Sequence, residues 1–377
     1  MNEEERIAFI ALHNIEGVGD VTIRQLISYC GSPNEVFKLP KRKLLKIPGI
    51  GEVTANSIQT GKYLQKAEEE IKKALKDNTK IYLYTDPEYP TRLKNIGQAP
   101  AMLYLKGDVD LNYNKIIAIV GTRQATKYGK DAITEIIEGL VAHKPIIISG
   151  LAYGIDIHSH QQALTQGLQT IAVLGSGMDV IYPNAHLPTA KKIVTQGGLV
   201  TEQCYGSLPE AHFFPARNRI IAGMCDGLIV AESAEKGGAI ITANLANEYN
   251  KDVFAIPGNI GNKYSTGCNK LIKTLKANLL TSVEDIEYIM NWNKNEEKQI
   301  GQLELELIHF DNREQIVIDK LNERNGPTQI DELCIKTGFS HGELASILLS
   351  LEIKNVISSL PGKSYQVAHK FASSKNT

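Results

Sequence analysis

Arginine, asparagine and glycine occur in short motifs whose chemistry suits phosphate binding. Arg123 closely follows the apolar run 116–120, and Arg217, Asn218 and Arg219 are consecutive. Arginine binds phosphate through paired hydrogen bonds, and asparagine can bond a phosphate or a base edge. These motifs predict a site for a ligand that carries phosphate.

Small-residue loops follow most of the candidate strands. They are Gly121-Thr122-Arg123, Ser149-Gly150-Leu151-Ala152, Gly175-Ser176-Gly177, Gly237-Gly238-Ala239 and Pro257-Gly258-Asn259. Glycine lets backbone N–H groups approach an anion closely, and helix N-termini favour negative charge. In a parallel sheet such loops meet at the carboxyl edge. We therefore predict an anion-binding crevice there, with Gly121, Thr122, Ser149, Gly150, Gly175, Gly177 and Gly238 among its residues.

The same loops argue against a nucleotide cofactor. A dinucleotide site requires G-x-G-x-x-G, but the segment 175–180 lacks the third glycine, and no P-loop motif is present. Aromatic residues near the loops could instead stack on bases: Tyr128, Tyr153, Tyr182, Phe213 and Phe214. A structural alternative stays open, in which Arg123 pairs with Asp156 or Glu202 and the aromatic rings belong to the core.

Short apolar runs predict the elements that position these loops. The candidate strands are 116–120, 146–149, 170–174, 199–202, 228–231 and 253–256, with helices at 130–142 and 239–249 and edge strands at 81–84 and 102–105. Continuous Ile- and Val-rich runs are typical of strands buried on both faces of a parallel sheet. We expect an α/β domain over residues 80–288, an extended Rossmann-like, doubly wound parallel sheet.

Residues 1–78 are expected to form a helical domain of the helix-hairpin-helix or SAM-like kind. Two similar turns, 15–19 and 47–51, each place a Gly-x-Gly before an apolar-periodic segment. Lys41, Arg42, Lys43 and Lys46 lie between them. Two interpretations remain open: the turns hold DNA phosphates, or the domain is a helical adaptor with solvated lysines.

Residues 289–312 are polar and are expected to be a linker, followed by a winged helix over 313–370. Its pattern predicts three helices and a hairpin, with a capping box at Ser340 and Glu343 and a turn at Pro361-Gly362. The candidate recognition helix, 341–350, has no Lys or Arg. Because base reading normally uses Arg, Lys, Asn or Gln, this favours a protein-contact or accessory role over a sequence-specific regulator.

Composition limits the class of protein. The net charge of −1 means that any binding of DNA must rely on local basic sites. The apolar runs are too short to cross a bilayer and no signal peptide is evident, so we expect a cytoplasmic protein with no membrane partner. The five cysteines are scattered without a CxxC pair, and we predict neither a metal site nor disulfides.

Motifs across the central segment resemble the DNA processing protein A (DprA/Smf) family. They are Tyr89-Pro90 with Leu93; 119–123 with Tyr128-Gly129; 149–152 with 154–156 and His160; 170–175 with Gly177, Asp179 and 182–184; 214–221; Gly238 with Thr242-Ala243; 255–258; and 267–269 with Leu271-Ile272. The order of the motifs also matches that family.

The resemblance implies single-stranded DNA binding in a basic pocket, a homodimer, and no cofactor. It implies protection of incoming DNA and help in loading the RecA recombinase during natural transformation or recombination. Arg123 would be a main phosphate ligand, and Arg217, Asn218 and Arg219 would line or support the pocket. The family's basic residue after Tyr182-Pro183 falls in the stretch from Asn184 to Lys191, where either His186 or Lys191 would replace it.

An enzyme of the phosphoribohydrolase type is the alternative. Such enzymes use a P-G-G-x-G-T-x-x-E loop, but the segment 236–243 has no carboxylate, and the next one is Glu248. Asp156, His158 and His160 form a conceivable acid/base set. We expect instead that Asp156 caps a helix and that the histidines are partly exposed. No catalytic residue is predicted.

Overall fold

The computed structural model describes residues 1–292, 310–323, 327–354, 356–360 and 363–367. The chain forms two compact units, 1–292 and 293–377, and each is described by itself. The predicted boundary between residues 78 and 80 falls inside the first unit, and most of the predicted linker lies outside the described residues. In the described part of the chain, no helix has the length and apolarity needed to span a bilayer.

A single nine-stranded sheet forms the centre of residues 1–292, in the order β1-β2-β6-β5-β4-β3-β7-β8-β9. The strands are β1 (Thr79–Leu83), β2 (Met102–Gly107), β3 (Ile116–Val120), β4 (Ile146–Ser149), β5 (Thr170–Val173), β6 (Gly197–Thr201), β7 (Gly227–Val230), β8 (Asp252–Ala255) and β9 (Asn278–Leu279). Neighbours from β6 to β9 pair in parallel, whereas β1 and β2 add an antiparallel edge. The predicted α/β class and all eight predicted strands are confirmed. The sequence analysis missed β9, which has only two residues.

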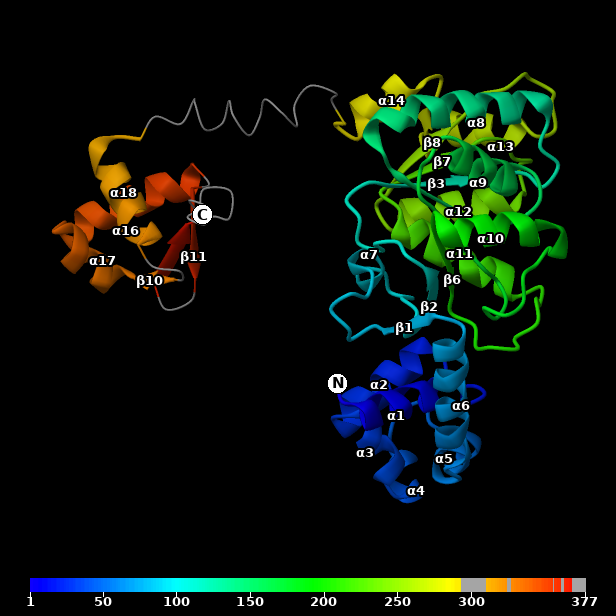
Figure 1. Cartoon of the computed structure of the whole chain (residues 1–377), viewed down its shortest axis with the longest axis horizontal. Helices are drawn as coiled ribbons and strands as arrows, with labels where there is room; N and C mark the ends of the chain where they lie inside the picture. The colour runs from blue at the N-terminus through cyan, green and yellow to red at the C-terminus, as the bar shows by residue number, and fades with distance from the viewer. Residues whose placement is uncertain (293–309, 324–326, 355, 361–362, 368–377) are drawn as a thin grey trace. The chain divides into compact units, whose positions relative to one another are not determined.

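Helices cover both faces of this sheet (Figure 1). They are α7 (Thr91–Lys94), α8 (Lys127–Leu140), α9 (Ile155–Thr165), α10 (Leu187–Thr195), α11 (Phe213–Met224), α12 (Gly238–Glu248), α13 (Thr266–Lys273) and α14 (Val283–Ile289). Alternate residues of β3 enter different cores: Ile116, Ala118 and Val120 pack with α11 and α12, and Ile117 and Ile119 pack with α8 and α9. Burial on both faces explains the continuous apolar run.

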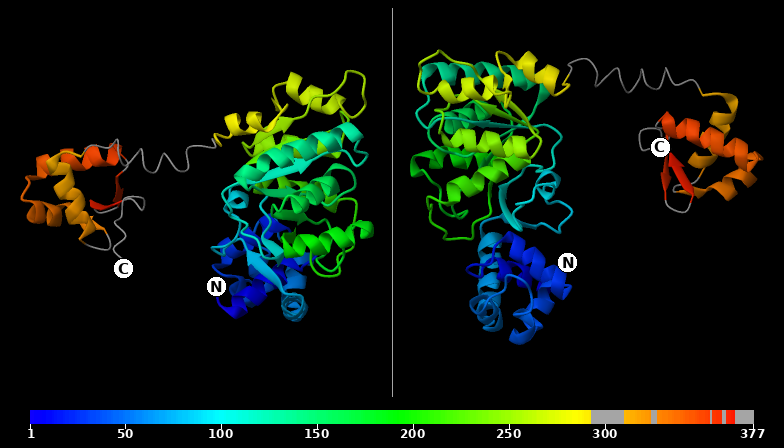
Figure 2. Two further views of the ribbon diagram at one scale, coloured as in Figure 1. Left: turned by 45° about the horizontal axis from the view of Figure 1, so that its top comes forward. Right: turned by 180° about the vertical axis from the view of Figure 1, so that it is seen from behind.

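The N-terminal helices pack against the antiparallel edge of the sheet, as both views in Figure 2 show. They are α1 (Glu3–His13), α2 (Asp20–Cys30), α3 (Pro33–Lys38), α4 (Lys41–Leu44), α5 (Glu52–Gln59) and α6 (Lys62–Lys76). The two Gly-x-Gly turns have the same backbone: Gly17 and Gly49 have φ of 79° and 80°, and Gly19 and Gly51 are N-caps. Glycine tolerates positive φ without strain, so the shared Ile-x-Gly-x-Gly pattern gives the two turns the same backbone conformation.

The second unit has the predicted winged-helix elements. They are α16 (Asn312–Asn322), β10 (Thr328–Gln329), α17 (Ile330–Thr337), α18 (His341–Ile353), β11 (Ile357–Leu360) and β12 (Ser364–Val367). The three strands form one antiparallel sheet. Ser340 and Glu343 make the predicted capping box at α18. The predicted turn at Pro361-Gly362 lies outside the described residues.

Candidate nucleic-acid interface

A crevice of about 660 Å³ opens at the carboxyl ends of β3 and β7. These two strands are the point at which the strand order reverses, because β4 to β6 lie on one side of β3 and β7 to β9 on the other. Ligands of doubly wound sheets bind at such a switch point. The walls come from the loop 121–124, the start of α11, the loop 233–238 with the start of α12, and residues 263–264.

The loop that carries Arg123 is fixed at both ends. The Thr122 N–H donates to the backbone oxygen of Glu232 at 2.8 Å, and Thr126, the N-cap of α8, donates its hydroxyl and its N–H to the Glu232 carboxylate. Gly154 packs against the same loop at φ +80°, where a Cβ would lie 2.2 Å from the Thr122 oxygen. The backbone is therefore organised before any ligand binds.

The Arg123 side chain is exposed at the crevice, and its guanidinium lies 5.7 Å from the ring centroid of Phe214. Among the described residues, no carboxylate is within ion-pair distance of it. The alternative in which Arg123 pairs with Asp156 or Glu202 is therefore wrong. An uncompensated cation beside an aromatic ring suits a nucleotide, because the cation attracts the phosphate and the ring stacks on the base.

Arg217 lines the crevice but is buried, with 5% of its surface exposed. Its Nη1 donates to the backbone oxygen of Gly150 at 2.6 Å and to that of Val173. Burial lowers the pKa of its guanidinium to about 10, although Asp156 nearby opposes this shift. Arg217 thereby joins α11 to the ends of β4 and β5. Asn218, the next residue, also lines the crevice.

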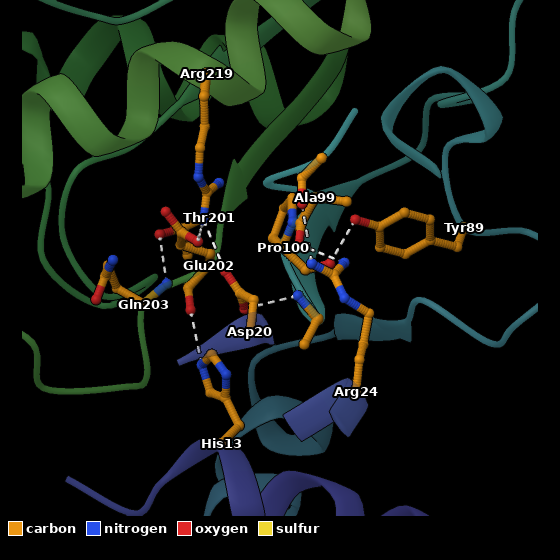
Figure 3. A network of polar contacts seen from close by, with 12 residues as sticks. His13, Asp20, Arg24, Tyr89, Ala99, Pro100, Thr201, Glu202, Gln203 and Arg219 are labelled. Atoms are coloured by element: carbon orange, nitrogen blue, oxygen red, sulfur yellow. Dashed lines mark hydrogen bonds and ion pairs between the residues drawn. The ribbon is translucent and has the colours of Figure 1, made fainter. Parts of the chain in front are cut away.

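Arg219 lies outside the crevice lining and joins the helical domain to the sheet (Figure 3). Its Nη2 pairs with Asp20 at 2.9 Å and with Glu202 at 2.5 Å. The Asp20 carboxylate also accepts a hydrogen bond from the Ala101 N–H at 2.8 Å. Both carboxylates are largely buried, so the Nη2 of Arg219 is engaged in an ion-pair network at this junction.

Further contacts strengthen the same junction. Arg24 donates to the backbone oxygens of Ala99 at 3.0 Å and Gly97 at 3.2 Å, and His13 Nε2 lies 3.1 Å from the Glu202 backbone oxygen. Burial lowers the pKa of His13 and raises that of Glu202. The first hairpin is thereby docked on the sheet. The second hairpin has no such contacts among the described residues, and Arg42, Lys43 and Lys46 beside it are exposed.

The crevice contains six of the thirteen predicted binding residues: Gly121, Thr122, Arg123, Arg217, Asn218 and Gly238. The others lie outside its lining. Ser149 is buried and donates its hydroxyl to the Ile119 oxygen, and the Gly150 oxygen accepts from Arg217. Gly175 and Gly177 pack against Phe214 and Cys204. Asn184 and Lys191 are exposed beyond it, while His186 is buried and hydrogen-bonds the Leu151 oxygen at 2.7 Å.

Residues that the sequence analysis did not select also line the crevice, among them Gln124, Lys263 and Tyr264. The last two follow the Pro257-Gly258-Asn259 loop after β8. The rule that ligand residues follow the carboxyl ends of parallel strands would have found them, had it been extended a few residues along that loop.

Of the conceivable acid/base set, Asp156 lines the crevice, whereas His158 and His160 lie outside its lining. Gly154 rather than Asp156 is the N-cap of α9, and burial raises the pKa of Asp156. The expectation that both histidines are partly exposed is wrong for His160, which is fully buried against Thr170. Burial lowers the pKa of His160 to about 3, so its imidazole is neutral at physiological pH.

Fold and site together define a three-part protein: a helix-hairpin-helix domain, a Rossmann-type sheet with a crevice at its carboxyl edge, and a winged helix. Family models agree with each part. DNA recombination-mediator protein A matches residues 80–291, the DprA winged helix domain matches 309–363, and the SAM-like helix-hairpin-helix tandem matches 9–60. The chain belongs to the DprA/Smf family.

Individual relatives cover most of the chain. Protein Smf of Synechocystis sp. is 30% identical over 97% of this chain and 100% of its own length. The DNA processing protein DprA of Streptococcus pneumoniae is 43% identical over 53% of this chain and 71% of its own. An X-ray structure of the S. pneumoniae protein aligns at a TM-score of 0.65 with 34% identity, over 76% of this chain and 97% of that one. A structure of DNA processing protein A from Helicobacter pylori, determined to describe its single-stranded DNA binding mode, aligns at a TM-score of 0.51 with 26% identity. The alignment covers 56% of this chain and 95% of that one.

Proposed function

We propose that this chain binds single-stranded DNA in the crevice. The observation that carries the proposal is Arg123, an exposed guanidinium beside Phe214 with no carboxylate partner among the described residues. The crevice is large enough for a nucleotide, which must be unstacked to enter it. The H. pylori relative, whose structure describes a single-stranded DNA binding mode, supports single-stranded DNA as the ligand.

We further propose that the bound strand is incoming DNA in natural transformation or recombination, and that the protein helps to load a RecA-type recombinase on it in the cytoplasm. Family membership supports this role, since the matching model is a recombination mediator. In the winged helix, Ile335, Leu349 and Ile353 are exposed apolar side chains. Such residues suit a contact with protein rather than with phosphate.

We also propose a homodimer. Strand β9 is an edge of the sheet; Leu279 within it is 49% exposed, and Leu275 just before it is 94% exposed. An exposed apolar edge strand is a favourable surface for pairing with a second copy. Sedimentation should show a dimer that Leu275→Glu with Leu279→Glu converts to monomer. A dimer unaffected by both changes would place its interface elsewhere.

A binding protein is favoured over a nucleotide hydrolase. Glu248, the first carboxylate after the glycine loop, is at the far end of α12, about 9 Å along the helix from Thr242, the last residue of α12 that lines the crevice, at 1.5 Å per residue. Asp156, the carboxylate in the crevice lining, is buried at the start of α9.

The test is titration of the protein into fluorescent oligo-dT by anisotropy at several salt concentrations, with unlabelled duplex as competitor. We expect binding that weakens with salt, with a log–log slope of roughly −0.7 per phosphate contacted, and poor competition by duplex. Absence of binding, or equal competition by duplex, contradicts the proposal. Hydrolysis of nucleoside monophosphates would then be measured.

A further inference from the structure

The crevice contains a second pair of a cation and an aromatic ring, on the loop after β8. Lys263 Nζ lies 5.4 Å from the ring centroid of Tyr264, and both residues line the same crevice as Arg123 and Phe214. Lys263 is exposed, and within the described residues no carboxylate is at ion-pair distance from it. Each pair thus combines an uncompensated cation with an aromatic ring.

The second pair is held in place by its own contacts. The Tyr264 hydroxyl hydrogen-bonds the side chain of Gln124, which is the neighbour of Arg123. The Tyr264 backbone oxygen accepts from the Ser233 N–H at 2.7 Å, which joins this loop to the end of β7. At the start of the loop, the N–H and the oxygen of Gly258 bond the side chain of Asn269 on α13, at 3.1 and 2.8 Å. The loop is therefore positioned relative to the Arg123 loop.

We infer that the crevice binds two consecutive nucleotides, one at each pair. Arg123 and Phe214 take one phosphate and base, and Lys263 and Tyr264 take the phosphate and base of the adjacent nucleotide. The inference rests on the proposed function and specifies its ligand further: the smallest ligand that contacts both pairs is a single-stranded dinucleotide. Aromatic stacking tolerates every base, so this arrangement fixes the path of the strand without selecting its sequence.

The first experiment measures oligo-dT affinity for Lys263→Ala and for a matched control, Lys270→Ala. Lys270 is an exposed lysine on α13 that pairs with Glu235 at 2.5 Å and does not line the crevice. We expect Lys263→Ala to weaken binding about three- to tenfold and to reduce the salt slope by roughly 0.7, the value for one phosphate contact. Lys270→Ala should match the wild type.

Tyr264 gives an independent measurement. Tyr264→Ala should weaken oligo-dT binding about tenfold, because stacking on an aromatic side chain typically contributes that much per base. Tyr264→Phe keeps the ring and should retain most of the affinity. Circular dichroism of each variant confirms that the fold is intact.

A competition experiment tests the two-nucleotide site directly. Thymidine dinucleotide with a 5′-phosphate should displace labelled oligo-dT at lower concentration than thymidine monophosphate does. Lys263→Ala should remove that advantage. If wild type binds oligo-dT and Arg123→Ala weakens it, but Lys263→Ala and Tyr264→Ala both behave like Lys270→Ala, this inference is wrong and the proposed function stands. If wild type does not bind oligo-dT, both are wrong.

Discussion

The crevice and the junction between the helical domain and the sheet both lie beside α11, and their arginines differ in their partners. At the junction, Arg219 pairs with Asp20 and Glu202 in a largely buried network. In the crevice, Arg123 is exposed and has no carboxylate partner among the described residues. A compensated buried charge holds domains together, whereas an uncompensated exposed charge is available to a ligand. Charge compensation, rather than residue type, separates the two roles.

The largest expected effect is at the junction. Arg219→Ala leaves two partly buried carboxylates without their cation, and removal of one partner of a buried ion pair costs about 3–5 kcal/mol of folding free energy. Denaturant unfolding should show this loss, with oligo-dT affinity within about twofold of wild type where the variant is folded. Lys270→Ala, which breaks an exposed pair, should cost at most about 1 kcal/mol. Equal losses in the two variants would contradict the structural role of the network.

In the crevice, a substitution should reduce DNA affinity and leave folding stability nearly unchanged. Arg123→Ala should weaken oligo-dT binding about ten- to hundredfold, because hydrogen bonds to charged groups contribute about 1.5–3 kcal/mol each. Its unfolding free energy should stay within about 0.5 kcal/mol of wild type, since the side chain is exposed. The comparison between the two regions fails if Arg219→Ala loses as much DNA affinity as Arg123→Ala.

The two hairpins of the helical domain differ in the same way, and we expect a smaller effect on DNA affinity from them. The first hairpin is docked on the sheet through Asp20 and Arg24, whereas the second makes no such contacts with the sheet among the described residues and has exposed lysines. If the second hairpin holds the DNA backbone, Lys43→Glu with Lys46→Glu should weaken oligo-dT binding about threefold and reduce the salt slope by about 1.4, the value for two phosphate contacts. Lys72→Glu with Lys73→Glu, exposed on α6, is the charge-matched control. An unchanged slope would favour the interpretation as a helical adaptor.

The smallest expected effect is a change of folding stability with pH, through the titration of Glu202. Burial raises the pKa of Glu202 in the folded state, so the folded protein retains this proton over a pH range in which the unfolded chain has released it. The contribution of Glu202 to stability is therefore present below its ordinary pKa and is lost as pH rises through the folded value. Glu202→Gln removes this titration. The stability of wild type relative to Glu202→Gln should fall as pH rises from about 4.5 toward neutrality, and a rise would contradict the assigned direction.

The sequence determined the elements and the edge at which the site lies. The apolar run 116–120 becomes a strand buried on both faces, and the turns 15–19 and 47–51 become equal hairpins, because both patterns act over a few neighbouring residues. The carboxyl-edge rule placed Arg123 and Gly238 in one crevice although they are far apart in the chain.

Only the tertiary structure decided what each residue of Arg217-Asn218-Arg219 contacts. Successive residues on a helix are about 100° apart, so they face different surroundings. Arg217 supports the strand ends, Asn218 lines the crevice and Arg219 joins the domains. Whether a cation is ion-paired depends on carboxylates from distant segments of the chain, as Asp20 pairs with Arg219. For the same reason, Lys263 and Arg123 meet at one crevice only because β8 and β3 are parallel strands that flank β7.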